Sequence, residues 1–227
     1  MMLLFALLFL SHTATGPGQM RFTDAQHGIS FTYPRGYTLK QGSLGAHDTG
    51  LGYLGPIPME FVAPGGVRIA TVEAPRGSYP GTDFINAFFT VSVNPSISGE
   101  ECSHFDDSRP GLQKLSLKTT AGVTLRGVNV SNAGLGHQAS LEYYHVFSHG
   151  QCIELGYGLA TAGLGAVDGM QPAPYKSIDA RFRAILLSVA INQPKTHRDR
   201  GVQRRPAHSG LLPTHRSAIA ASDSQTI

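Results

Sequence analysis

Two stretches rich in branched apolar and aromatic residues, 138–147 and 151–160, are separated only by Ser148, His149 and Gly150. Residues of this kind favour β-strands, and a connection this short that ends in glycine is typical of a β-hairpin. The two stretches therefore predict a pair of adjacent antiparallel strands in this part of the chain.

Other segments repeat the strand pattern. Ile29, Phe31 and Tyr33 alternate with polar residues and precede a Pro-x-Gly turn, as in a half-buried strand. Further strands are expected at 59–63, 67–74, 87–94 and 122–131. With 27 glycines and only 15% charged residues, the composition suits a β-rich protein with many turns and disfavours a helical bundle.

Helical periodicity is clear in one place, near residue 180. Apolar residues recur there at i, i+4, i+7, i+8 and i+11, which is one face of an amphipathic helix; they are Ile178, Phe182, Ile185, Leu186 and Val189. The β-branched end at Val189–Ile191 is also compatible with a last strand. The mixed segment 97–115, which contains four acidic residues between 100 and 107, is expected to form a turn or a short helix.

The first ten residues are uninterrupted by charge, although no lysine or arginine precedes them. The run is too short to span a bilayer and is typical of a signal peptide, with small residues at Ala14 and Gly16 for cleavage. No later segment reaches transmembrane length. We therefore expect a signal peptide over 1–16, one domain over 17–193, no membrane span, and a secreted or periplasmic product.

Basic charge is concentrated at the carboxyl end. Residues 194–227 contain six Lys and Arg against two Asp, a net charge of +4, which leaves −1 on the preceding 193 residues. This end is poor in apolar residues and has no aromatic residue, so we expect a disordered tail. A nucleic-acid-binding face would combine basic and aromatic side chains, and we expect no nucleic-acid partner.

Two segments lie at the two ends of the expected domain, residues 28–37 (GISFTYPRGY) and residues 178–191. In the second segment the expected helix runs into Ile185-Leu186-Leu187-Ser188-Val189. Both resemble the corresponding ends of the Mog1/PsbP-like superfamily, although Val189 stands where that group usually has an aromatic residue. The resemblance implies an α+β fold: an antiparallel β-sheet of about six strands with flanking helices. It implies no active site, because members share none and act mostly as binding or assembly modules.

Two cysteines in an exported chain usually pair with each other, so we expect a disulfide between Cys102 and Cys152. Together with His104 and His149 they would also be chemically suitable zinc ligands. Their spacing matches no standard zinc motif, however. We therefore interpret the histidines of region 137–154 as exposed strand or turn residues, and expect no metal or other cofactor.

Candidate catalytic groups are few. Glu142 and Glu154 flank the predicted hairpin and could face each other as an acid–base pair, although two solvated carboxylates are the simpler interpretation. No Gly-x-Ser-x-Gly nucleophile motif occurs. In the loop 42–58, a Gly-x-Gly-x-x-Gly pattern is followed at once by prolines, which disfavours the helix that a nucleotide site requires.

These features favour an exported, non-enzymatic binding or structural module whose partner is an unidentified protein or small molecule. The alternative is a metal-binding or hydrolytic periplasmic protein that uses His145, His149, Glu142 and Glu154 in the His-rich region 137–154. On the first hypothesis, replacing His145 and His149 by Asn should change stability little.

Overall fold

The computed structural model of the chain describes residues 18–42, 65–106, 111–134, 136–163 and 169–192. The expected signal peptide (1–16), the expected strand at 59–63 and the expected tail (194–227) lie outside these residues. So does almost all of the glycine-rich loop 42–58. Among the described helices, none is both long and apolar enough to cross a membrane.

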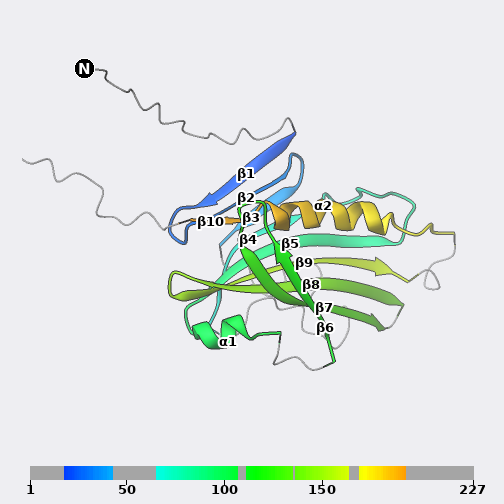
Figure 1. The fold of residues 1–227 in the computed structure, drawn as a ribbon. Coiled ribbons are helices and arrows are strands. Elements are labelled where there is room, and N and C mark those ends of the chain that lie inside the picture. Colours follow the sequence, from blue (N-terminus) through cyan, green and yellow to red (C-terminus); the bar gives the residue numbers. More distant parts are fainter. Residues whose placement is uncertain (1–17, 43–64, 107–110, 135, 164–168, 193–227) are drawn as a thin grey trace, which may run out of the picture. The chain divides into compact units, whose positions relative to one another are not determined.

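Most of the strands form one seven-stranded sheet in which every neighbouring pair is antiparallel (Figure 1). In spatial order they are β3 (Thr38–Gln41), β4 (Val67–Glu73), β5 (Phe84–Asn94), β9 (Gln151–Ala162), β8 (His137–Ser148), β7 (Thr124–Gly134) and β6 (Gln113–Lys118). The predicted α+β fold with an antiparallel sheet is confirmed, and the sheet has one strand more than the six expected.

A second, three-stranded sheet contains the strand predicted around Phe31. It consists of β1 (Gln19–Asp24), β2 (Ile29–Pro34) and β10 (Ala190–Ile191), with β2 in the centre. Ile29, Phe31 and Tyr33 are buried, as their alternation predicted. Because Ala190 and Ile191 pair with β2, the end of the predicted helix is indeed a short strand.

Helix α2 (Tyr175–Leu187) packs on one face of the main sheet, mainly against β9 and β5. Ile178, Phe182, Ile185 and Leu186 are buried, which confirms the predicted apolar face. At the end of the helix, the Ser188 hydroxyl accepts a 2.9 Å hydrogen bond from the backbone N–H of Thr32. This bond joins α2 directly to β2 of the smaller sheet.

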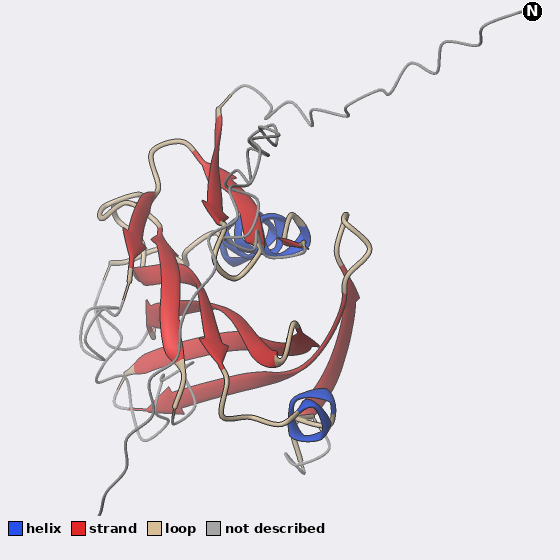
Figure 2. Cartoon of the chain, turned by 90° about the vertical axis from the view of Figure 1, so that its left-hand side faces the viewer, coloured by secondary structure: helices blue, strands red, loops and turns tan. Residues whose placement is uncertain are grey.

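Helix α1 (Gly99–Ser103) lies against the other face of the main sheet, and Figures 1 and 2 show the sheet between the two helices. Its start is fixed by a capping box, in which Ser98 and Glu101 each bond the other's backbone N–H. A disulfide between Cys102 in α1 and Cys152 in β9 confirms the predicted pairing, with the Cα atoms 5.7 Å apart.

The predicted hairpin is formed by β8 and β9, which pair from Ser148–Gln151 outward. Its two turn residues, His149 and Gly150, both have positive φ angles, 53° and 76°. Two such residues match the twist of the strands they join. The register that this turn sets decides which side chains of the two strands share a face.

Candidate functional site

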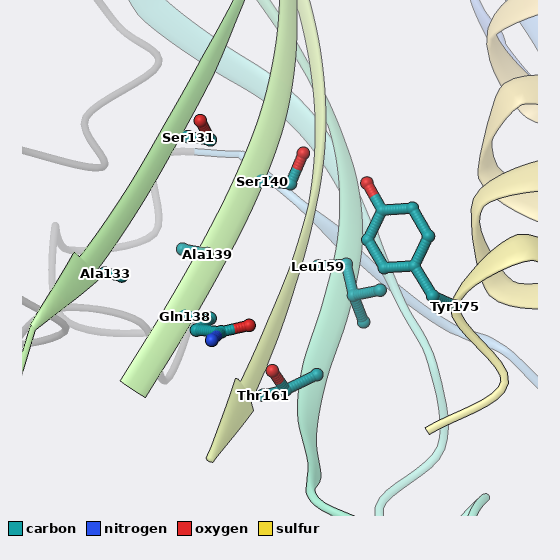
Figure 3. A pocket seen from close by; sticks show the side chains of 8 residues that line it. All are labelled: Ser131, Ala133, Gln138, Ala139, Ser140, Leu159, Thr161 and Tyr175. Atoms are coloured by element: carbon teal, nitrogen blue, oxygen red, sulfur yellow. The ribbon is translucent and has the colours of Figure 1, made fainter. Parts of the chain in front are cut away.

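A hollow of about 270 Å³ lies on the α2 side of the main sheet (Figure 3). Three strands form its floor, and the first residue of α2, Tyr175, forms one wall. The lining residues are Ser131 and Ala133 of β7, Gln138, Ala139 and Ser140 of β8, Leu159 and Thr161 of β9, and Tyr175. Alternation along each strand brings most of these side chains to one face.

The lining is uncharged and mixes apolar residues with hydrogen-bonding ones. None of the eight described residues carries a formal charge, and hydroxyl or amide groups come from all three strands and the helix. Such groups both donate and accept hydrogen bonds. Tyr175 is 45% exposed, so its ring presents an apolar surface at the wall of the hollow. The arrangement suits a small uncharged ligand that forms hydrogen bonds.

Next to the hollow, two residues further along β8 and β9, a partly buried hydrogen-bond network joins the sheet to α2. Tyr144 donates to Glu142 Oε2 at 2.6 Å, and Tyr157 donates to Asp179 Oδ1 at 3.0 Å. Arg183 of α2 lies 3.5 Å from Glu142 Oε1. The last two of these contacts join α2 to the sheet beside the hollow.

The tyrosines of this network are held in their neutral form. Burial is the main cause that raises the pKa of Tyr144 and of Tyr157 far above the ordinary value of 10.0. The negative charge of Glu142 raises the pKa of both phenols further. Both tyrosines therefore remain hydrogen-bond donors at pH values where an exposed tyrosine already loses its proton.

Tyr144 reaches its position because the residue opposite it is glycine. Gly127 pairs with Tyr144 across β7 and β8. A Cβ atom on Gly127 would lie 2.6 Å from Cδ1 of Tyr144, and closer still to the carbonyl oxygen of Tyr143. The missing side chain leaves the space that the Tyr144 ring occupies.

The opposite face of the sheet has a polar row that crosses five strands. Arg68, Ser92, Glu154, His145 and Arg126 are direct cross-strand neighbours on β4, β5, β9, β8 and β7. Glu154 is fully buried and accepts hydrogen bonds from Ser92 (3.1 Å) and from the Tyr143 hydroxyl (2.8 Å). A buried carboxylate needs such donors to compensate for lost hydration.

His145 lies in the middle of this row beneath α1. Its ring stacks on Phe105 with centroids 3.9 Å apart, and its Nε2 lies 3.6 Å from Glu154 Oε1. Its Nδ1 lies 3.6 Å from Sγ of Cys152. The side chain is only 4% exposed, so the expectation of an exposed strand histidine was wrong for this residue. The reason is that α1, held down by the disulfide, covers this face of β8.

The candidate residues of region 137–154 are thus divided between two faces. In the hairpin register Glu142 pairs with Tyr157 and Glu154 pairs with His145, so the carboxylates point to opposite faces. The expectation that Glu142 and Glu154 could face each other was therefore wrong, and Glu154 is not solvated. His149 is exposed in the turn, and His104 is exposed at the end of α1. Only His145 and Glu154 are brought together.

Sequence reasoning missed the residues of the hollow. Gln138, Ser140 and Glu142 alternate along β8, which places three polar side chains on one strand face. That alternation was the available signal. It does not distinguish a binding surface from an ordinary solvated face, because neutral serine, threonine and glutamine form no recognisable motif.

No protein-family model matches the chain, and no curated protein matches its sequence. Solved structures do match. One is a Bacteroides thetaiotaomicron protein that is 8% identical with a TM-score of 0.42, and the match covers 76% of this chain and 48% of that protein. The chain therefore spans about half the length of that protein.

The chain is similar to PsbP. The cyanobacterial PsbP of Synechocystis is 13% identical with a TM-score of 0.39, and the match covers 80% of this chain and 99% of PsbP. LpqN, which is involved in cell envelope biogenesis of Mycobacterium tuberculosis, is 10% identical with a TM-score of 0.38, over 76% and 90% of the two chains. The similarity to PsbP agrees with the resemblance of residues 28–37 and 178–191 to the Mog1/PsbP-like superfamily. No property of the site follows from these similarities.

Proposed function

We propose that this chain is an exported, non-enzymatic binding module and that its ligand occupies the hollow between α2 and strands β7–β9. The observation that carries this proposal is the convergence of uncharged hydrogen-bonding groups on one partly open space. They include Gln138, Ser140 and Thr161 from two strands and Tyr175 from the helix. A concave site with a few convergent polar groups is the usual form of a small-molecule site.

The lining indicates the chemistry of the ligand. Because the lining is uncharged, a charged ligand would lose hydration there without a counter-charge from these residues. An uncharged molecule with hydroxyl or amide groups would exchange its bonds to water for bonds to Ser140, Thr161 and Gln138. At about 270 Å³ the hollow is small for a drug-sized molecule. It therefore fits a small ligand or one group of a larger ligand.

The hollow lies beside contacts that join α2 to the sheet. Tyr157 bonds Asp179 of α2, and Arg183 of α2 bonds Glu142 of β8, so two contacts tie α2 to the sheet beside the hollow. Preformed sites of this kind bind without a large cost of ordering the protein. We therefore propose that the hollow exists before the ligand arrives.

Export is supported by the disulfide, which persists in oxidising compartments. We propose the domain organisation accordingly, with a signal peptide over 1–16, a single domain over 17–193 and a basic tail over 194–227. N-terminal sequencing of material recovered outside the cytosol tests the first element. A product that begins near residue 17 is expected, and one that retains Met1 would contradict the proposal.

Binding is tested by amide NMR of the isotope-labelled protein during titration with a library of uncharged polyols and small amides. Shifts should cluster at residues 138–140, 159–161 and Tyr175, and Tyr175→Ala should weaken the binding of any hit. Phe147→Ala is the matched control, because Phe147 is a similarly exposed aromatic residue (40%) on the opposite face of β8. Hits that map elsewhere, or that bind Tyr175→Ala as well as the parent, would contradict the proposal.

A further inference from the structure

Three side chains that can ligate a metal meet beneath α1. The sulfur atoms of Cys102 and Cys152 and one ring nitrogen of His145 all lie within 4.8 Å of one another. All three residues are buried. In the oxidised chain the two sulfurs are bonded to each other, so the group contains no thiolate. Reduction would convert the same place into a set of two sulfurs and one nitrogen.

The imidazole is already oriented for this role. Nδ1 of His145 lies 3.6 Å from Sγ of Cys152, and Nε2 lies 3.6 Å from the Glu154 carboxylate. Histidines that ligate metals commonly present their second nitrogen to a carboxylate, which fixes the ring orientation and leaves the first nitrogen free to coordinate. Phe105 stacks on the ring and prevents it from turning away.

The carboxylate is itself fixed. Ser92 donates to one oxygen of Glu154 and Tyr143 donates to the other. Around protein metal sites, hydrogen bonds of this kind hold in place the carboxylates that orient the ligating histidines. Glu154 therefore acts as a positioning residue for His145 and is not a ligand.

We propose that, when the disulfide is reduced, Cys102, Cys152 and His145 together bind one Zn²⁺ ion. The disulfide and the metal would then be alternative states of the same site. A dithiol reductant supplies two electrons and two protons, the S–S bond breaks to give two thiols, and the dithiol is oxidised to its own disulfide. Binding of Zn²⁺ then releases the two thiol protons and forms two Zn–S bonds and one Zn–N bond.

The charge and the geometry of the three residues fit Zn²⁺. Two thiolates neutralise the ion, which matters because an uncompensated charge is costly at a fully buried position. With Zn–S bonds of about 2.3 Å in tetrahedral geometry, the sulfurs would have to separate to roughly 3.8 Å. The Cα atoms, 5.7 Å apart, permit this by rotation of the two side chains. Three protein ligands leave the fourth position for water.

The test is a titration of the full chain with Co²⁺, which reports thiolate ligation by a charge-transfer absorption band, followed by competition with Zn²⁺. The chain is first reduced with a phosphine, which has no thiol to compete for the metal. We expect one Co²⁺ per reduced chain, displacement by one Zn²⁺, and no band in the oxidised chain. Reduced chain that stays folded by circular dichroism and binds no Co²⁺ would overturn the proposal.

Variants show whether His145 and Glu154 contribute to metal binding or whether the two thiols alone bind the ion. His145→Gln should weaken Co²⁺ binding at least tenfold, and Glu154→Gln should weaken it by about 10–100-fold. His149→Asn and His104→Asn, which change exposed histidines outside the site, should leave the affinity unchanged. If reduction unfolds the chain, the metal should restore the folded spectrum in the parent and not in His145→Gln. Equal Co²⁺ affinity of the parent and His145→Gln would overturn the proposal.

Discussion

Tyr144 donates a 2.6 Å hydrogen bond to the carboxylate of Glu142, which lies two residues earlier on the same face of β8. The other oxygen of Glu142 faces Arg183 of α2 at 3.5 Å. A strand and a helix that are far apart in the sequence are thus joined through one carboxylate. The consequences for stability can be measured.

The first prediction concerns alkaline pH. Because the pKa values of Tyr144 and Tyr157 are raised in the folded state, the unfolded chain releases these protons first as the pH rises. Their contribution to stability is fully present below the ordinary tyrosine pKa of about 10 and decreases above it. Each phenol should steepen the decrease by about 1.4 kcal/mol per pH unit. Urea denaturation at several pH values measures this slope.

The control is the double variant Tyr144→Phe/Tyr157→Phe, which should lose this part of the slope and keep the part due to other titrating groups. The double variant should also be less stable at neutral pH, since each lost hydrogen bond costs about 1 kcal/mol. An unchanged slope in the double variant would show that these two phenols titrate normally.

The second prediction concerns the disulfide. Cys102 and Cys152 are 50 residues apart in the sequence, and both are fully buried. Chain-entropy estimates give about 4 kcal/mol for a loop of this length, as an upper value. The variant Cys102→Ala/Cys152→Ala should lower the free energy of unfolding by about 2–4 kcal/mol, as measured by chemical denaturation. A variant as stable as the oxidised parent would contradict this expectation.

The third prediction concerns Gly127. A Cβ atom there would overlap the backbone carbonyl of Tyr143 and the Tyr144 ring, so Gly127→Ala should destabilise the protein by about 1–3 kcal/mol. Gly158→Ala is the control, because the three atoms nearest to its Cβ would be side-chain atoms of Phe88 and Leu141, at 3.1–3.2 Å. Thermal unfolding should rank Gly127→Ala as the less stable variant. The reverse order would show that β7 shifts to accommodate the methyl group.

The fourth prediction distinguishes His145 from His149, although the sequence alone predicted the same small effect for both. His149→Asn should change stability by less than about 0.5 kcal/mol, because asparagine tolerates the positive φ of this turn position. His145→Asn should cost about 1–3 kcal/mol, because it removes a buried ring stacked on Phe105. The expectation that both changes are harmless is thereby revised. Equal stabilities of the two variants would contradict the revision.

Local patterns predicted the parts of the fold that depend on neighbouring residues. The alternation of Ile29, Phe31 and Tyr33 and the helical spacing of Ile178 and Phe182 both matched the structure. Strands β1, β3 and β6 were not predicted. Strand β6, Gln113–Lys118, has only two apolar residues, Leu115 and Leu117, so its alternation is too short for a sequence pattern to identify.

The site was less predictable because it depends on register. The sequence shows that Glu142 and Glu154 flank the same turn, but only the pairing of Ser148 with Gln151 shows that they point to opposite faces. Likewise, His145 is buried beneath α1 and Phe105, which follows that helix. The residues around position 145 do not indicate that a short helix from a distant part of the chain covers them.

The two-residue turn at His149 and Gly150 also has an evolutionary consequence. Inserting or deleting a single residue there would slip one strand against the other, and side chains that now share a face would be separated. Glu154 would no longer pair with His145, and Glu142 would no longer lie on the same face as Tyr157. Relatives that keep both arrangements should therefore conserve the length of this turn even where its residue types have diverged.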